Sequence, residues 1–194
     1  LFSSPESAAV RRLVLSGNMI TARGQDLSGL KALLEVLAEF THPLSLELAN
    51  CGLGVAEVNE GAAALQAGAT SLEALTLDGN PIGYPSSVTL KPGAANGVDV
   101  KKGVFAAIND RFGEVTMNPD SDAEVKLRWL DDGQESDYTK VSQLTSVVAS
   151  CNDLIEDYSH IQSLGEALSS SKVHTYGLAE CKFNPATLAT FVGS

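Results

Sequence analysis

Apolar residues recur along the chain in one fixed pattern that occurs five times. An apolar residue is followed three places later by an apolar-x-apolar pair, then three places on by Asn or Cys, and two places further by another apolar residue. The alternation within the pair is typical of a short, half-buried β-strand. We therefore expect five short strands, which precede the Asn or Cys positions Asn18, Cys51, Asn80, Asn152 and Cys181.

Helical patterns lie between these expected strands. Residues 30–37 place leucines at i, i+3, i+4 and i+7, and residues 161–168 repeat this apolar stripe. Residues 61–67 are rich in Ala, and Asn184 with Pro185 form an N-cap followed by Pro at the first helical position. Strand and helix are therefore expected to alternate along the chain.

The spacing of the Asn or Cys positions shows one repeat length and one interruption. Cys51 and Asn80 are 29 residues apart, as are Asn152 and Cys181, whereas Asn80 and Asn152 are 72 residues apart. This pattern resembles a leucine-rich repeat, and the spacing resembles the ribonuclease-inhibitor type, in which a short strand alternates with a helix. The resemblance implies a curved solenoid that binds other proteins on its surface.

The segment inserted between the third and fourth copies, residues 84–143, has a different period. Short β-type runs follow a loop rich in Pro and Gly, and turn-forming Asn, Asp and Gly residues separate them. Val125, Leu127 and Trp129 alternate with basic residues, as in a strand with one buried face. This Gly-turn-strand pattern, which ends in Trp, Asp-Gly and a Tyr-containing strand, resembles an SH3-like, Tudor-type barrel.

Together these patterns predict an α/β fold: a leucine-rich repeat solenoid of about five repeats, interrupted by a small all-β SH3-like barrel. Residues 1–83 would form repeats 1 to 3, residues 84–143 the inserted barrel, and residues 144–194 repeats 4 and 5. Terminal repeats of a solenoid carry polar caps, because each repeat otherwise exposes its apolar flank. Neither end of this chain shows such a cap, so we expect a neighbouring protein to cover one end.

Charge and hydropathy narrow the range of partners. The 194 residues include 13 Lys plus Arg against 24 Asp plus Glu, which gives a net charge of −11, and the basic residues do not cluster. Such a chain would repel a phosphate backbone, so we expect no nucleic-acid partner. The sequence has no run of about 18 apolar residues, so we expect no membrane-spanning segment.

The three cysteines favour a reducing intracellular compartment. Cys51 and Cys181 occupy the small, buried position of the pattern, Cys151 lies beside Asn152, and no CxxC spacing typical of zinc sites is present. The first residue is Leu1 rather than methionine. Either a leader has been removed, as on import into a mitochondrion or plastid, or the terminus is truncated.

The sequence carries no recognised catalytic or cofactor-binding motif. Its three histidines lie outside any nucleophile, metalloprotease or nucleotide-binding signature. The aspartate pairs Asp120 with Asp122 and Asp131 with Asp132 have ligand types suited to calcium, but the two turns would lie at opposite ends of one strand. We therefore expect no catalytic residue, no cofactor and no metal site.

Two surfaces of the expected solenoid are candidate protein-binding sites. Its concave side carries mostly small residues, with Arg12, Glu47 and Asp78 as its charged members, and is either a peptide-docking groove or a solvated inner sheet. Leu188 and Phe191 lie on the last expected helix, at the uncapped carboxyl end. Apolar residues at an uncovered end are suited to contact with another protein.

The barrel offers a third candidate site. Phe112, Trp129 and Tyr138 could form an aromatic cage that holds a methylated Lys or Arg through cation–π contact, a use to which Tudor-type barrels are put. Trp129 shares its face with Val125 and Leu127, which favours a core position instead.

We therefore expect a non-catalytic interaction or structural subunit of a larger assembly. One alternative is an adaptor or reader whose barrel binds a peptide, methylated or not. Another is a regulatory binder of an enzyme, in the manner of ribonuclease inhibitor. None of the patterns identifies the partner.

Overall fold

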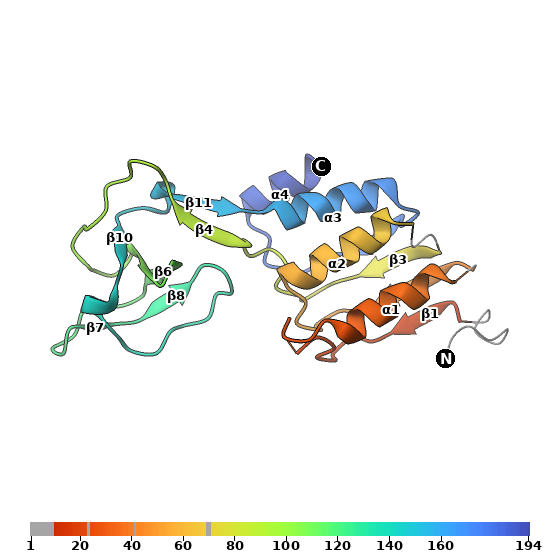
Figure 1. Cartoon of the computed structure of the whole chain (residues 1–194), viewed down its shortest axis with the longest axis horizontal. Coiled ribbons are helices and arrows are strands. Elements are labelled where there is room, and N and C mark those ends of the chain that lie inside the picture. The colour runs from red at the N-terminus through yellow and green to blue at the C-terminus, as the bar shows by residue number, and fades with distance from the viewer. Residues whose placement is uncertain (1–9, 23, 41, 69–70) are drawn as a thin grey trace. The chain divides into compact units, whose positions relative to one another are not determined.

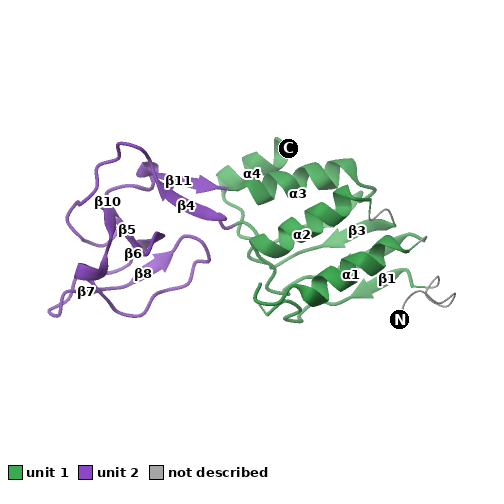
Figure 2. Ribbon diagram, in the orientation of Figure 1, with its two compact units in different colours: residues 1–83, 158–194 green, residues 84–157 purple. Residues whose placement is uncertain are grey.

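The structure is a computed structural model that describes residues 10–22, 24–40, 42–68 and 71–194. The chain forms two compact units (Figure 2). Unit 1 comprises residues 1–83 and 158–194, and unit 2 comprises residues 84–157.

Unit 1 has a parallel sheet with helices along one face (Figure 1). The strand order is β1-β2-β3-β12, and each neighbouring pair is parallel. Strands and helices alternate along the chain: β1 (Arg12–Val14), α1 (Ser28–Ala38), β2 (Leu44–Glu47), α2 (Val55–Gln66), β3 (Leu72–Thr76), α3 (Ser159–Ser170), β12 (Thr175–Gly177) and α4 (Pro185–Val192).

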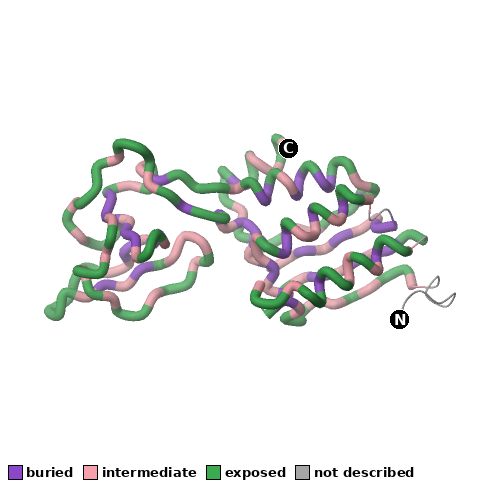
Figure 3. Tube along the Cα trace, viewed as in Figure 1, coloured by how far each residue is buried: buried purple, intermediate pink, exposed green. Residues whose placement is uncertain are grey.

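The repeated apolar positions of this sheet are in register. Leu13 lies opposite Leu46, Leu46 opposite Leu75, and Leu75 opposite Tyr176. These side chains point toward the helices, where leucines of α1, α2 and α3 complete one apolar core. Figure 3 shows the buried residues along the strands and on the inner faces of the helices.

Three of the Asn or Cys positions, Cys51, Asn80 and Cys181, join their turn to the end of the preceding strand in the sheet. The Asn80 side chain is fully buried and makes four hydrogen bonds. Its Oδ1 accepts from the backbone N–H groups of Cys51 and Leu53 at 2.9 and 3.0 Å. Its Nδ2 donates to the carbonyl oxygens of Leu48 and Leu77, both at 2.7 Å. This uses both donors and both lone pairs of the amide, so no polar atom of Asn80 is left unsatisfied in the core.

The cysteines occupy the same place in their own turns. Cys51 Sγ donates to the carbonyl oxygen of Leu15 at 3.3 Å, and Cys181 Sγ donates to that of Leu77 at 3.2 Å. Just before the Asn or Cys, the backbone enters the left-handed region at Gly17, Asn50, Gly79 and Glu180. The turns therefore share one geometry although their residues differ.

Unit 2 is built from short strands and two single-turn 3₁₀ helices. A four-stranded antiparallel sheet has the order β10-β5-β6-β8, and the pairs β4-β11 and β7-β9 form two-stranded sheets. The elements are β4 (Ser87–Leu90), β5 (Phe105–Ile108), β6 (Arg111–Val115), β7 (Glu124–Val125), β8 (Leu127–Trp129), β9 (Thr139–Lys140), Val141–Gln143 (3₁₀), β10 (Ser146–Val148), Cys151–Asp153 (3₁₀) and β11 (Leu154–Asp157).

Both faces of the four-stranded sheet are apolar. Val115, Leu127 and Val147 belong to a cluster on one face. Phe112, three residues before Val115 on β6, and Val148, next to Val147 on β10, belong to a separate cluster on the other face. Successive side chains of a strand point to opposite faces, so the alternation divides the core of unit 2 in two.

The expected fold class, a five-repeat leucine-rich repeat solenoid carrying an all-β SH3-like barrel, is wrong. The described residues form a mixed α/β fold with four α-helices and several small sheets, and these sheets do not close into a clear barrel. The fourth expected repeat strand, β10, pairs antiparallel with β5 in unit 2 rather than joining the parallel sheet. Unit 2 accordingly extends to Asp157, beyond the expected boundary at Gln143. An apolar-x-apolar pair suits a half-buried strand in either kind of sheet, so the pattern alone did not determine its neighbours.

Candidate functional site

Helix α4, at one end of unit 1, begins with residues that favour the start of a helix. Asn184 is its N-cap: Asn184 Oδ1 accepts from the backbone N–H of Thr187 at 2.9 Å, and Thr187 Oγ1 accepts from that of Asn184 at 2.7 Å. Pro185 follows at the first helical position, where its missing N–H costs no hydrogen bond. These contacts start the helix, and the inward side chains of Thr187 and Phe191 hold it on the unit.

The outward face of α4 is apolar. No residue from Pro185 to Val192 is charged. Leu188 and Val192, one turn apart, are 51% and 75% exposed. The neighbouring helix α3 instead exposes polar residues such as Gln162 and Glu166. An exposed helix face without charge is a candidate site for contact with another surface.

Strand β12 continues this apolar end on the sheet. Tyr176 occupies the same row as Leu46 and Leu75, but it is 49% exposed where they are 1% and 7% exposed. Its ring contacts Phe191 edge-to-face, with centroids 5.9 Å apart. A groove lined by Tyr176, Phe191, Val192 and Val173 opens beside them. The end of unit 1 thus presents its core side chains to solvent.

The sequence singled out two residues of this candidate surface. Leu188 and Phe191 were expected there, and the structure places Leu188 on the exposed face and Phe191 half-buried beneath it. It missed Tyr176 and Val192. The available signal was the absence of any charge over eight consecutive helical residues, whereas the exposure of Tyr176 follows from the position of β12 at the end of the sheet.

The three charged residues expected on the sheet face bind other parts of unit 1. Arg12 Nε donates to Glu47 Oε1 at 2.6 Å. This hydrogen bond raises the pKa of Arg12 and lowers the pKa of Glu47. Asp78 Oδ1 accepts from the backbone N–H of Ala179 at 2.8 Å, and its carboxylate fills the space above Gly177, where a Cβ would lie 2.7 Å from Oδ1. Arg12 and Glu47 thus form one pair, and Asp78 joins β3 to the turn after β12.

The three expected cage residues do not converge. Phe112 is buried in one cluster of unit 2, whereas Trp129 packs against the other, on the opposite face of the sheet. Trp129 pairs with Gly113, the residue after Phe112, which accounts for their opposite directions. Tyr138 is 58% exposed.

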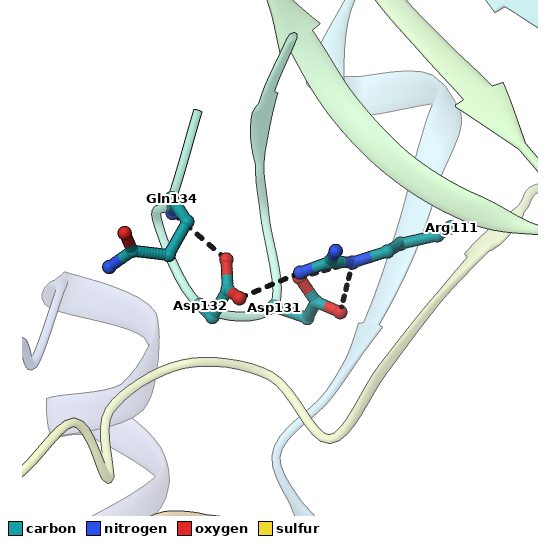
Figure 4. Close-up of polar contacts among 4 residues, drawn as sticks. All are labelled: Arg111, Asp131, Asp132 and Gln134. Atoms are coloured by element: carbon teal, nitrogen blue, oxygen red, sulfur yellow. Dashed lines mark hydrogen bonds and ion pairs between the residues drawn. The ribbon is translucent and has the colours of Figure 1, made fainter. Parts of the chain in front are cut away.

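Basic side chains of the same chain already lie over the rings of Trp129 and Tyr138. The Arg111 guanidinium is 4.5 Å from the centroid of Trp129, and Lys126 Nζ is 4.8 Å from that of Tyr138. Arg111 also donates to Asp131 at 2.8 Å and to Asp132 at 2.7 Å (Figure 4). The hydrogen bond to Asp131 contributes most to raising the pKa of Arg111. A ligand cation would have to displace these groups.

The leucine core of unit 1 contains a small cavity of about 50 Å³, lined by α1, α2 and the sheet. Glu57 lies at its wall, with its carboxylate held by Thr21 Oγ1 at 2.5 Å and by the backbone N–H of Gly54 at 2.9 Å. The void is apolar and far smaller than the 300 Å³ or so of a typical small-molecule site. We interpret it as a packing defect of the core.

Other chemistry is sparse in the described part of the chain. There, no group of three or more His, Cys, Asp or Glu residues could hold a metal ion. Cys51 and Cys181 are buried and Cys151 is exposed, and burial raises the pKa of the Cys181 thiol. Across the described ranges, no helix combines the length and apolar character needed to cross a membrane.

Comparisons with known proteins identified no relative of this chain. No protein-family model matches the chain, and no curated protein or solved structure is significantly similar to it.

Proposed function

We propose that this protein is a non-catalytic subunit that binds another protein through the end of unit 1 formed by α4 and β12. The observation that carries this proposal is the charge-free, exposed face of α4, with Leu188 and Val192 at its centre. Covering such a face removes apolar side chains from water and so favours association.

The adjoining groups support a protein partner. Tyr176 and Phe191 supply aromatic rings next to the exposed helix face, and large aromatic residues are enriched among the residues that dominate interface energies. The net charge of −11 disfavours a nucleic acid at the same place.

A reader function for unit 2 has weaker support. Phe112 and Trp129 lie on opposite faces of one sheet, and Arg111 covers Trp129. A regulatory binder of an enzyme would use the same α4 surface as a structural subunit, so the identity of the partner separates these two roles.

Cross-linking mass spectrometry on the native source tests the proposal. We expect cross-links to a protein chain from Lys182, which precedes α4, or from Lys172, which precedes β12. Leu188→Glu should abolish that association, because it places a charge in an apolar contact. Ala32→Glu, which puts the same charge on the exposed face of α1, is the matched control and should bind normally. If both variants keep their partners at wild-type occupancy, the proposed surface is wrong.

A further inference from the structure

The turns of unit 1 are of two kinds, which alternate across the sheet. The turns after β1 and β3 carry Asn18 and Asn80, and those after β2 and β12 carry Cys51 and Cys181. Each Asn follows a glycine in the left-handed region, and its carbonyl oxygen accepts from the N–H two residues later at 2.9 Å in both turns. Each Cys instead has a left-handed residue on both sides. Asn18 therefore lies in a turn like that of Asn80, and Cys181 in a turn like that of Cys51.

The junction between β2 and β3 shows how an Asn turn binds a Cys turn. Asn80 Oδ1 accepts from the N–H groups of Cys51 and Leu53, and Asn80 Nδ2 donates to the carbonyl oxygen of Leu48. The three backbone groups belong to the strand end and turn of β2, and the side chain belongs to the turn of β3. A Cys turn thus supplies two donors and one acceptor that match one carboxamide.

The turn after β12 presents the same three backbone groups at the edge of the sheet. They are the N–H groups of Cys181 and Phe183 and the carbonyl oxygen of Leu178, and none of them is hydrogen-bonded within the described part of the chain. At the opposite edge, Asn18 is exposed, and its Oδ1 accepts no hydrogen bond from the residues that the structure describes. The two edges of unit 1 therefore carry the two halves of the β2–β3 junction.

We propose that a second copy of this chain docks on β12 through its own β1, parallel and in the register of β2 with β3, so that its Asn18 binds the turn after β12. This rests on the proposed function, because it names the occupant of that same surface. The register places Leu13 of the second copy beside Tyr176 and continues the apolar row of the sheet. The two contacting patches differ, so the association is head-to-tail and admits further copies.

The helices fit the same arrangement. Contacts run from α1 to α2, α2 to α3 and α3 to α4, so α1 and α4 are the outermost helices of their layer. Leu188 and Val192 stand one and five residues after the buried Thr187. The corresponding residues of α1, one and five after the buried Leu30, line the groove that α1 forms with α2. Leu188 and Val192 thus lie on the side of α4 where the α1 of a second copy would pack.

Blocking one edge at a time in the full-length chain tests the junction. By analytical ultracentrifugation at up to about 100 μM, in about 0.15 M salt to screen the net negative charge, wild type should form species that exceed twice the 20.3 kDa chain mass as concentration rises. Asn18→Ala removes the carboxamide, and Leu188→Glu places a charge in the α4 contact. Each variant alone should associate at least tenfold more weakly than wild type.

A mixture of the two variants gives the sharpest result. The intact β12 edge of the Asn18→Ala chain can still bind the intact β1 edge of the Leu188→Glu chain. An equimolar mixture should therefore form a one-to-one dimer with wild-type affinity and stop there, because both remaining edges are blocked.

Two further measurements make the result specific. Asn152→Ala, at the exposed Asn of the same sequence pattern in unit 2, is the matched control and should leave association unchanged. Amide hydrogen exchange at Cys181 and Phe183 should be slower in the wild-type assembly than after dilution to monomer, because these N–H groups become hydrogen-bonded.

The outcomes separate this inference from the proposed function. A wild-type chain that stays monomeric, that stops at a closed dimer, or whose blocked variants do not pair on mixing overturns the head-to-tail junction. If the chain is monomeric and still cross-links to a different protein beside α4, the proposed function stands and only the second copy is wrong. If it is monomeric and Leu188→Glu changes no association, both are wrong.

Discussion

The inner strands β2 and β3 and the outer strand β12 carry the same sequence pattern, yet their core residues are buried to different degrees. Leu46 and Leu75 have strands on both sides and helices above them, and they are almost fully buried. Tyr176 has a strand on one side only and remains half exposed. In this sheet, burial depends on the neighbouring strand–helix pairs as much as on the residue itself.

The turns after inner and outer strands also differ in how deeply they are buried. Asn80, between inner strands, makes four buried hydrogen bonds, whereas Asn18, in the turn after β1, is exposed and donates to the carbonyl oxygens of Leu15 and Ser16 at 2.9 and 3.4 Å. An Asn in the turn after an inner strand should therefore contribute more to the free energy of unfolding than an Asn in the turn after an outer strand. The predictions below test that conclusion.

The largest effect is expected at Asn80. Asn80→Ala removes the side-chain partners of three backbone groups, the N–H groups of Cys51 and Leu53 and the carbonyl oxygen of Leu48, and should lower the free energy of unfolding by about 4 kcal/mol. Asn18→Ala, the matched change in the exposed turn, should cost less than about 1 kcal/mol because water replaces its contacts. Urea denaturation of both variants measures the difference. Equal losses would show that interior and end turns are equivalent.

A smaller difference in stability is expected between two residues that lie in the same row across the sheet, Leu46 and Tyr176. Leu46→Ala should lower the free energy of unfolding by about 3 kcal/mol, because it leaves a cavity in a closed core. Tyr176→Ala should cost only about 1 kcal/mol in dilute monomer, since half of the side chain is already in water. Thermal and urea unfolding at low protein concentration compare them. A Tyr176→Ala loss as large as that of Leu46→Ala would contradict the exposed end.

The turn after β12 contains a strained residue where the turn after β2 has glycine. Gly52 and Lys182 each follow the Cys position, with φ of 69° and 64°. Lys182→Gly should raise the free energy of unfolding by about 0.5 to 1 kcal/mol, because glycine adopts this conformation without steric cost. Lys172→Gly, at a residue outside the left-handed region, should not stabilise. Equal effects of the two changes would argue against strain at Lys182.

The smallest expected effect concerns the thiol in that turn. Burial raises the pKa of Cys181 above its ordinary value of 9.0. Its contribution to stability is therefore complete below that value and is lost as pH rises through the raised pKa. Unfolding in the presence of reductant at about pH 7 and about pH 10 should show a shallower fall in stability for Cys181→Ser than for wild type. Identical pH dependence would mean that this thiol is ionised equally easily in both states.

Much of unit 1 could be predicted from the sequence. The strand positions around Leu13, Leu46, Leu75 and Tyr176 and the helices after them follow from local periodicity, and their register follows from the repeated spacing. The segment around Val147 shows the limit, because the same local pattern forms an antiparallel strand in unit 2. The aromatic residues of unit 2 show another limit: alternation places Trp129 with Leu127, but nothing in the pattern indicates that Arg111 covers its ring.

The sequence by itself determined where the strands and helices of unit 1 form, which of their side chains face inward, and that α4 carries no charge. These properties depend on residues close together in the chain, whose spacing matches the period of a strand or helix. The tertiary structure decided which strand stands at the edge, that the cage candidates lie on opposite faces, and that Leu188, Val192 and Tyr176 are left uncovered. Exposure is a property of what lies beside a residue in space, and in this protein that neighbour is set by the order of strands across a sheet.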